Sequence, residues 1–289
     1  MRSYLNFAVG TAISVGLLIA IPAAADPFKF STGSVTNQIA IASRPGPGPG
    51  SGVNQETEGA DDFLLKSTTR LNSATFTGLL PTGTTVSQVV VEIYRVFPKD
   101  SDTVRTPNVN TRANSPSDVE FTDRNGGVAG QLSFTTSLLN SSFTALNSVD
   151  TGIHPKPNQQ TGGEGATTGQ EEVRFAVTFT DPILLPDDHY FFVPQVLLSN
   201  PDQHFLWLSA SRPIDATGTP FMPDLQSWIR NADLDPDWSR VGTDIVGGTP
   251  VPTFNQAFTL AGDTVPEPAT LLLFGAGLIG LGFIRRRPH

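Results

Sequence analysis

Residues 173–180 read Val-Arg-Phe-Ala-Val-Thr-Phe-Thr, and this stretch decides the fold class. Val or Phe stands at every second position, and small or polar residues or an arginine stand between them. Successive side chains of a strand point to opposite faces of a sheet, so a period of two predicts a half-buried β-strand.

A second run, residues 86–97, is rich in β-branched residues and apolar on both faces, which is typical of a central strand. Shorter strand patterns, separated by turn residues, occur at Leu71–Thr77, Leu132–Thr135, Tyr190–Leu198, Phe205–Ala210 and Phe254–Leu260. Helical signals are limited to residues 223–229, where Pro223 and Asp224 are suited to opening a short helix.

The composition agrees with a strand-rich protein. Of 289 residues, 27 are Gly and 24 are Pro, and neither type is favoured inside helices. Many strands in series predict an all-β fold, namely an antiparallel, jelly-roll-like β-sandwich. Long polar loops are expected at residues 45–52, 100–118 and 152–170.

The net charge is −9 and the chain contains no Cys. An acidic chain without a basic patch is poorly suited to nucleic acid, so we expect no nucleic-acid partner. The lack of Cys excludes disulfides, thiolate catalysis and Cys-based zinc sites.

The N-terminus has the pattern of a secretory signal helix. Arg2 precedes an apolar stretch over residues 5–21, and small residues follow at Ala23 and Ala25. Signal peptidase recognises such an A-x-A pair, so we expect cleavage before Asp26. The alternative is an uncleaved membrane anchor.

The C-terminus combines three features: the motif Val265-Pro266-Glu267-Pro268, the uncharged stretch 271–284, and the cluster Arg285-Arg286-Arg287. A helix over the uncharged stretch would be about 21 Å long, which is short of the ~30 Å hydrocarbon core. The arginines would stay cytoplasmic and leave the preceding domain on the far side of the membrane.

This tail resembles the PEP-CTERM sorting signal of Gram-negative bacteria. The resemblance implies an exosortase as partner, a precursor held transiently in the inner membrane, and an association with exopolysaccharide and biofilm. A transmembrane helix that stays in place is the alternative. The expected organisation is a signal peptide at 1–25, an extracytoplasmic β-sandwich at 26–264 and the sorting signal at 265–289.

Sequence signatures of catalysis are missing. The chain has no G-x-S-x-G elbow, no H-E-x-x-H motif and no Walker loop. The three histidines expected to remain after processing, at 154, 189 and 204, are scattered. Adjacent acidic pairs at 61–62, 171–172 and 187–188 would point to opposite faces of a strand, so they are interpreted as edge, turn or solubility charges. We therefore expect no catalytic residues and no enzyme activity.

Three tryptophans bear on carbohydrate binding. Trp207 lies in an apolar run and is expected in the core, whereas Trp228 and Trp238 flank an acidic loop. These two are the candidates for exposed stacking on a sugar.

One acidic spacing is relevant to metal binding. Asp233, Asp235, Asp237 and Asp244 occupy positions 1, 3, 5 and 12 of an EF-hand count. Trp238 stands where that loop needs Gly, so two interpretations remain: a calcium loop of another type, or a solvated acidic loop. No cofactor is required, and Ca²⁺ is the only candidate.

Together these patterns predict an exported structural or adhesive protein of the cell surface or extracellular matrix, processed by signal peptidase and an exosortase. The alternatives are a carbohydrate-binding module for exopolysaccharide and a secreted hydrolase on a β-sandwich.

Overall fold

The computed structural model describes residues 25–46, 55–102, 104, 114–153, 160–211 and 224–266. Within this part of the chain, Asp26–Val265 form one compact unit. The signal helix and the short C-terminal apolar helix predicted from sequence lie outside the described residues. No helix in the described part of the chain is both long enough and apolar enough to cross a membrane.

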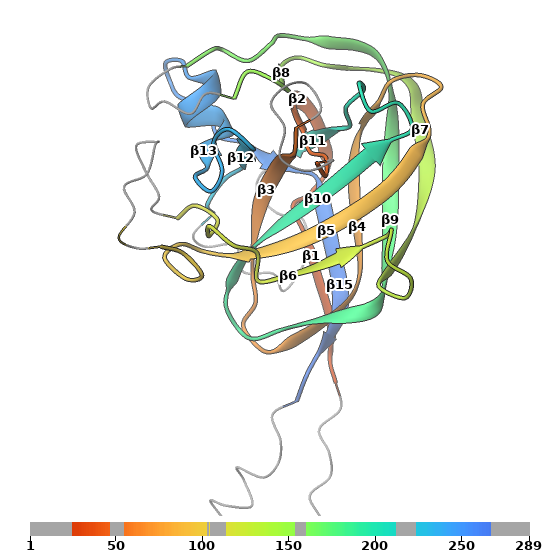
Figure 1. Cartoon of the computed structure of the whole chain (residues 1–289), viewed down its shortest axis with the longest axis vertical. Helices are drawn as coiled ribbons and strands as arrows, with labels where there is room; N and C mark the ends of the chain where they lie inside the picture. Colours follow the sequence, from red (N-terminus) through yellow and green to blue (C-terminus); the bar gives the residue numbers. More distant parts are fainter. Residues whose placement is uncertain are drawn as a thin grey trace, which may run out of the picture. The chain divides into compact units, whose positions relative to one another are not determined.

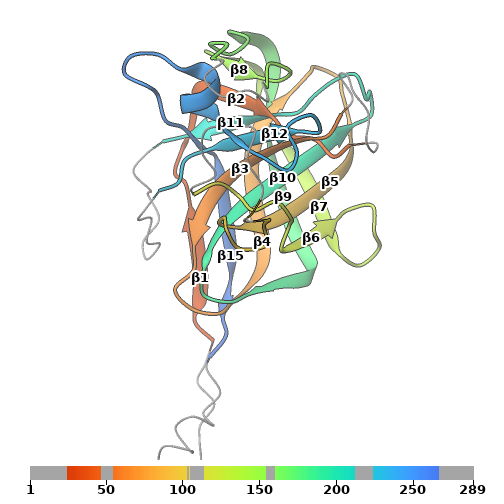
Figure 2. The same ribbon diagram turned by 60° about the vertical axis from the view of Figure 1, so that its left-hand side comes forward.

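The described chain is almost entirely β-strand and forms two sheets (Figures 1 and 2). The larger sheet contains β1 (Pro27–Ser31), β2 (Val35–Ala42), β4 (Thr69–Leu80), β7 (Leu132–Ala145), β8 (Ser148–Val149), β9 (Thr167–Leu185), β11 (Leu206–Ala210), β14 (Asn255–Gln256) and β15 (Phe258–Thr264). The smaller contains β3 (Thr57–Leu64), β5 (Val86–Arg95), β6 (Thr122–Asn125), β10 (His189–Leu198), β12 (Trp228–Asn231) and β13 (Ser239–Arg240).

The strand order mixes segments that are distant in the sequence. The smaller sheet runs β13-β12-β3-β10-β5-β6. The larger sheet runs β1-β15-β4-β11-β2-β8. β9 also pairs with β4 in this sheet, and β7 pairs with β9. The described pairs are antiparallel except β2 with β8. These sheets confirm the predicted all-β sandwich.

The two stretches that predicted strands behave as expected. Residues 173–180 lie inside β9, with the Val and Phe side chains buried and the intervening ones exposed. β5 lies between β10 and β6, and Val89 and Val90, which point to opposite faces, are both buried. The period-two pattern and the two-faced apolar pattern therefore predicted a half-covered and a central strand correctly.

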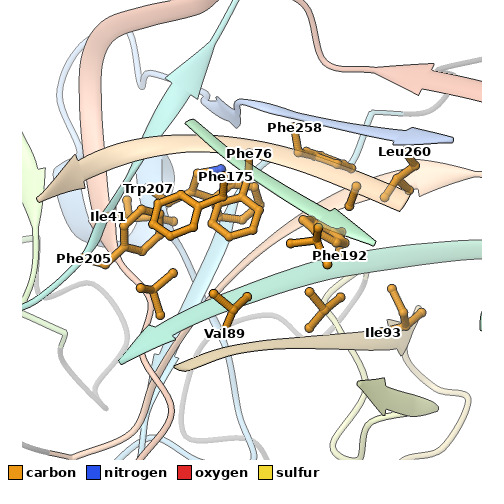
Figure 3. Close-up of a cluster of buried hydrophobic side chains, with 14 of the residues drawn as sticks. Ile41, Phe76, Val89, Ile93, Phe175, Phe192, Phe205, Trp207, Phe258 and Leu260 are labelled. Atoms are coloured by element: carbon orange, nitrogen blue, oxygen red, sulfur yellow. The ribbon is translucent and has the colours of Figure 1, made fainter. Parts of the chain in front are cut away.

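The main core lies between the sheets and is rich in aromatic rings (Figure 3). Phe192 of β10 stacks on Phe258 of β15 with ring centroids 4.9 Å apart, so this pair joins the two sheets. Trp207 is fully buried, as predicted, and its indole Nε1 donates to the carbonyl of Ala257 at 2.9 Å. Gly78 allows β11 to approach, since a Cβ there would lie 2.2 Å from the Phe205 ring.

The two ends of the domain are neighbouring strands of one sheet. β1 pairs with β15, in the register Pro27 opposite Asp263 (Figure 1). Thr264 N donates to the carbonyl of Asp26 at 2.8 Å, and Asp26 N donates to Thr264 Oγ1 at 3.1 Å. The chain therefore enters and leaves the domain at one point.

The structure contradicts the helix predicted at residues 223–229, because residues 224–229, which are described, are not helical. The Asp224 carboxylate accepts a hydrogen bond from Gln226 N at 2.8 Å, a local turn that competes with helix formation. Trp228 and Ile229 then begin β12, which pairs with β3. A single π-helical turn, η1 (Val241–Val246), follows β13.

Candidate functional site

A cleft of about 430 Å³ lies beside the smaller sheet and is strongly acidic. β3 supplies Glu58, β5 supplies Glu92 and Tyr94, and β12 supplies Arg230. The remaining lining residues come from adjoining segments: Glu56, Glu120, Ala232 and Asp235. Strand alternation places Glu58 on the same face of β3 as Ala60, whose side chain packs away from the main core.

Arg230 and Glu58 form the base of this cleft. The guanidinium Nε donates to Glu58 Oε2, and Nη2 donates to Oε1 at 2.9 Å. Arg230 is 5% exposed and Glu58 is 4% exposed. A two-pronged pair of this kind is stronger and more directional than a single charged hydrogen bond.

Tyr94 connects the ion pair to a second carboxyl group. Its hydroxyl lies 2.7 Å from Glu58 Oε1 and 3.1 Å from Glu92 Oε2, and it accepts from Arg230 Nη2 at 2.9 Å. Burial, followed by the charge of Glu58, raises the pKa of Tyr94 well above its usual value. The phenol therefore remains a hydrogen-bond donor.

Glu92 is a carboxyl group that holds its proton to unusually high pH. Burial raises the pKa of Glu92 well above the ordinary range, and repulsion from Glu58 and a hydrogen bond with it act in the same direction. Burial and the Glu58 charge also raise the pKa of Glu56. The cleft thus holds carboxyl groups that keep their protons to higher pH than exposed ones do.

Arg230 is held in place by aromatic rings as well as charges. Its guanidinium carbon lies 4.4 Å from the centroid of the Trp238 ring, and Nη1 lies 2.9 Å from Asp235 Oδ1. Burial is the largest single influence on the pKa of Arg230 and lowers it, but Glu58, Tyr94 and Asp235 together outweigh burial and the net pKa is raised. The cation therefore persists at all ordinary pH values.

Chemically, the cleft combines a fixed ion pair with a proton-holding carboxyl group. A carboxylic acid beside a carboxylate can donate and accept protons in one place, which is the requirement for general acid–base chemistry. The sequence reasoning did not single out these residues. The available signal was a charged residue in an apolar strand, as with Glu92 between Val91 and Ile93.

The prediction that Trp228 and Trp238 form an exposed stacking surface is wrong. Each is 1% exposed, and both pack with Leu225 and Tyr94 against the outer face of the smaller sheet. Their indole nitrogens donate to backbone carbonyls, Trp228 to Leu225 and Trp238 to Ser117, both at 3.0 Å. They cover this face of the sheet because an uncovered apolar face would contact water.

The four aspartates of the calcium hypothesis do not form a common metal site. Asp235 pairs with Arg230, and Asp244 pairs with Arg240 through Nη2 at 2.8 Å. Asp237 is buried. Over the described residues, which include Asp233 and its three companions, no group of three or more His, Asp or Glu side chains is arranged to hold a metal ion.

The acidic pair Asp61-Asp62 is not a surface charge, contrary to expectation. Both residues are buried in β3, which is a central strand. Asp61 Oδ2 accepts from Gln256 N at 2.6 Å, and Asp62 Oδ2 lies 2.6 Å from His189 Nε2. Buried carboxylates persist where such partners compensate for lost hydration.

The described histidines have carboxylate partners. His189 pairs with Asp62, and His204 Nδ1 pairs with Asp150 Oδ1. His154 lies outside the described residues.

Only part of the predicted processing sites is described. Ala25 and Asp26 are exposed at the start of the domain. Val265 N donates to the carbonyl of Thr68 at 2.8 Å, and the described chain ends at Pro266. The remaining predicted residues lie outside the described part: Ala23, Glu267, Pro268, Arg285, Arg286 and Arg287.

Comparisons with known proteins concern this same C-terminal region. No curated protein and no solved structure matches the chain. A comparison with protein families matches residues 264–287 to the PEP-CTERM protein-sorting motif. This match implies an exported protein that is anchored in the membrane before release and processed by an exosortase. The chain therefore carries a PEP-CTERM sorting motif, as its tail predicted from sequence.

Proposed function

We propose that the protein is a structural or adhesive component of the cell surface or extracellular matrix, associated with exopolysaccharide. The observation that carries the proposal is the pairing of β1 with β15 directly before the sorting motif. A precursor held by its tail would be attached through β15, next to β1, the strand at which the chain enters the domain.

The charge and core of the domain also support this role. Residues 26–265 carry 26 acidic and 14 basic side chains, which favours solubility after release. Among the described residues every aromatic side chain is buried or half-buried, which favours a structural domain over an aromatic carbohydrate platform.

The test is to locate the protein in its host. Antibody against the domain should detect it in the surface or matrix fraction of wild-type cells and in the inner membrane of cells lacking the exosortase. Deletion of the protein should weaken retention of the matrix. An inner-membrane location in both strains, or an unchanged matrix after deletion, would contradict the proposal.

A second candidate function is hydrolysis at the acidic cleft. It is favoured by Glu58 and Glu92, whose oxygens lie 2.7 Å and 3.1 Å from the same Tyr94 hydroxyl. Two carboxyl groups held around one hydroxyl are similar to the carboxyl pair that shares one proton in aspartic proteases. Glu92 would supply the proton for the leaving amine and would regain one from the attacking water, while Arg230 and Glu58 hold Tyr94 and the cleft in place.

The processed protein should then release peptides from denatured casein at acidic pH. Glu92→Gln should abolish that release, whereas Glu120→Gln, at the exposed rim of the same cleft, should retain it. Casein left intact by the wild-type protein over the acidic range would contradict this candidate.

A further inference from the structure

β7 is an edge strand of unusual length. It spans Leu132–Ala145 and, among the strands that the structure describes, pairs only with β9. Figure 1 shows it along the outer right-hand side of the domain. Backbone groups of an antiparallel strand alternate in direction, so half of those in β7 point away from β9.

The regular part of this edge is its first half. Leu132–Leu138 pair with Phe179–Val173 without interruption, whereas the register shifts three times between Leu138 and Ala145. Seven residues in unbroken register form a straight row of outward N–H and C=O groups. Such a row is a template for another strand.

The other edges of the two sheets are short or charged. β8 and β13 have two residues each, and β6 has four, including Asp123 and Arg124. β1 carries Lys29 and lies where the chain enters the domain. These features prevent edge-to-edge pairing, and β7 lacks them, since its 14 residues include neither a charged side chain nor a proline.

The edge is also exposed on both faces. Every side chain from Thr135 to Ser142 is exposed, including Leu138 at 59% and Leu139 at 48%. Among the side chains of β7 on the inward-facing side, Leu132 is buried, whereas Thr136 is already exposed. The smaller sheet therefore does not cover this part of the strand.

The absence of charged side chains in β7 makes this edge suitable for pairing with a second copy of the chain. The domain has 26 acidic and 14 basic residues, so two copies repel each other over most of their surfaces. The charge-free edge is where they can approach, and an antiparallel pairing of β7 with itself is self-complementary under a two-fold axis. We propose that β7 pairs with β7 of a second copy of this chain, centred on Thr135–Ser137, and joins the larger sheets of two molecules.

This dimer rests on and extends the proposed structural role. Its test measures only whether the purified protein dimerises, so the result does not depend on export or on a matrix. The two-fold contact uses the edge of each copy once, so the assembly closes at two. Ser and Thr side chains facing their counterparts can add cross-strand hydrogen bonds.

The experiment compares three forms of the processed protein by sedimentation over a concentration series. Thr135→Lys/Ser137→Lys places like charges across the contact and should shift the protein from dimer to monomer. The matched control, Thr178→Lys/Thr180→Lys, adds the same charge to exposed positions of β9, which is not an edge, and should remain dimeric.

Hydrogen exchange of the wild-type protein gives an independent readout if the edge variant fails to fold. Amides in Leu132–Leu138 should gain protection as the protein concentration rises. A wild-type monomer at every concentration, a dimer unaffected by the edge variant, equal loss in both variants, or β7 protection gained only with added exopolysaccharide would each overturn the proposal.

Discussion

Arg230 and Glu58 are 172 residues apart in the chain, yet they form two hydrogen bonds inside the protein. The pair joins β12 to β3, and the same Arg230 contacts Trp238 and Asp235 in the segment that follows β12. One buried cation therefore ties the 228–240 segment to the outer face of the smaller sheet.

Removal of the carboxylate should be costly. Glu58→Gln leaves the Arg230 charge buried without its main partner, and breaking a buried pair in this way typically costs about 3–5 kcal/mol. We expect a loss of this size in the free energy of unfolding, measured by urea denaturation. The change should be accompanied by faster hydrogen exchange in β12.

The control for this variant is Glu120→Gln, which removes an exposed carboxylate from the same cleft. It should change the free energy of unfolding by less than about 0.5 kcal/mol. The double variant Glu58→Met/Arg230→Met should be more stable than Glu58→Gln, because it removes both charges together. Equal stability of wild type and Glu58→Gln would mean that the pair does not hold this segment.

Glu92 should make stability depend on pH. Its pKa is raised in the folded protein, first by burial and then by Glu58, so the folded state binds more protons than the unfolded chain. Stability should therefore fall as pH rises from about 4.3, the pKa of an unfolded Glu, up to the folded pKa. Glu92→Gln should flatten this fall in unfolding free energies measured across the acidic range.

The Glu120→Gln variant again serves as the comparison, since it should keep the wild-type slope. Some slope should also persist in Glu92→Gln, because burial raises the pKa of Glu56 as well. Parallel curves for wild type and Glu92→Gln would refute the assignment of the proton to Glu92.

Local patterns were sufficient for long strands such as β5 and β9, whereas β2 and β3 were not predicted. The alternation in residues 173–180 and the two-faced apolar run at 86–97 depend on period and burial, which are properties of adjacent residues. Trp207 followed from its apolar neighbours in the same way. The sandwich class was therefore predictable, and so was the sorting tail, whose motif is contiguous.

The cleft was not predictable from the sequence, because its residues are brought together only by the pairing of strands that are distant in the chain. Glu58 and Arg230 come together since β12 pairs with β3, and no local signal specifies that pairing. The same explanation holds for Trp228 and Trp238: their acidic neighbours suggested exposure, but the 224–240 segment folds back over an apolar sheet face. Asp61 and Asp62 were misjudged because β3 is central.

Export should remove the first 25 residues. Ala23 and Ala25 fit the small pockets of signal peptidase, and Ala25 is exposed just before β1. Mass spectrometry of the exported protein should find Asp26 at its N-terminus, and Ala25→Leu should prevent that cleavage. Recovery of exported wild-type chains that retain Met1–Ala25 would show that the segment is an anchor.

Glu267 should be needed for release but not for folding. It lies within the matched sorting motif and outside the compact unit Asp26–Val265. We expect Glu267→Ala to leave the melting temperature of the domain unchanged and to accumulate as an unprocessed membrane precursor, detected by fractionation and immunoblotting. Release of this variant at the wild-type rate would contradict the role of the motif.

The acidic loop should not respond to calcium. If Asp233, Asp235, Asp237 and Asp244 held an ion, a hundredfold excess over Kd would stabilise the fold by roughly 2.7 kcal/mol, or several degrees of melting temperature. Asp235 and Asp244 instead face Arg230 and Arg240, so their repulsion is already compensated without a metal. We expect the melting curves of the processed protein in EDTA and in millimolar Ca²⁺ to coincide. A rise in calcium that Asp235→Asn abolishes would establish a site there, whereas an equal rise in both proteins would place the ion elsewhere.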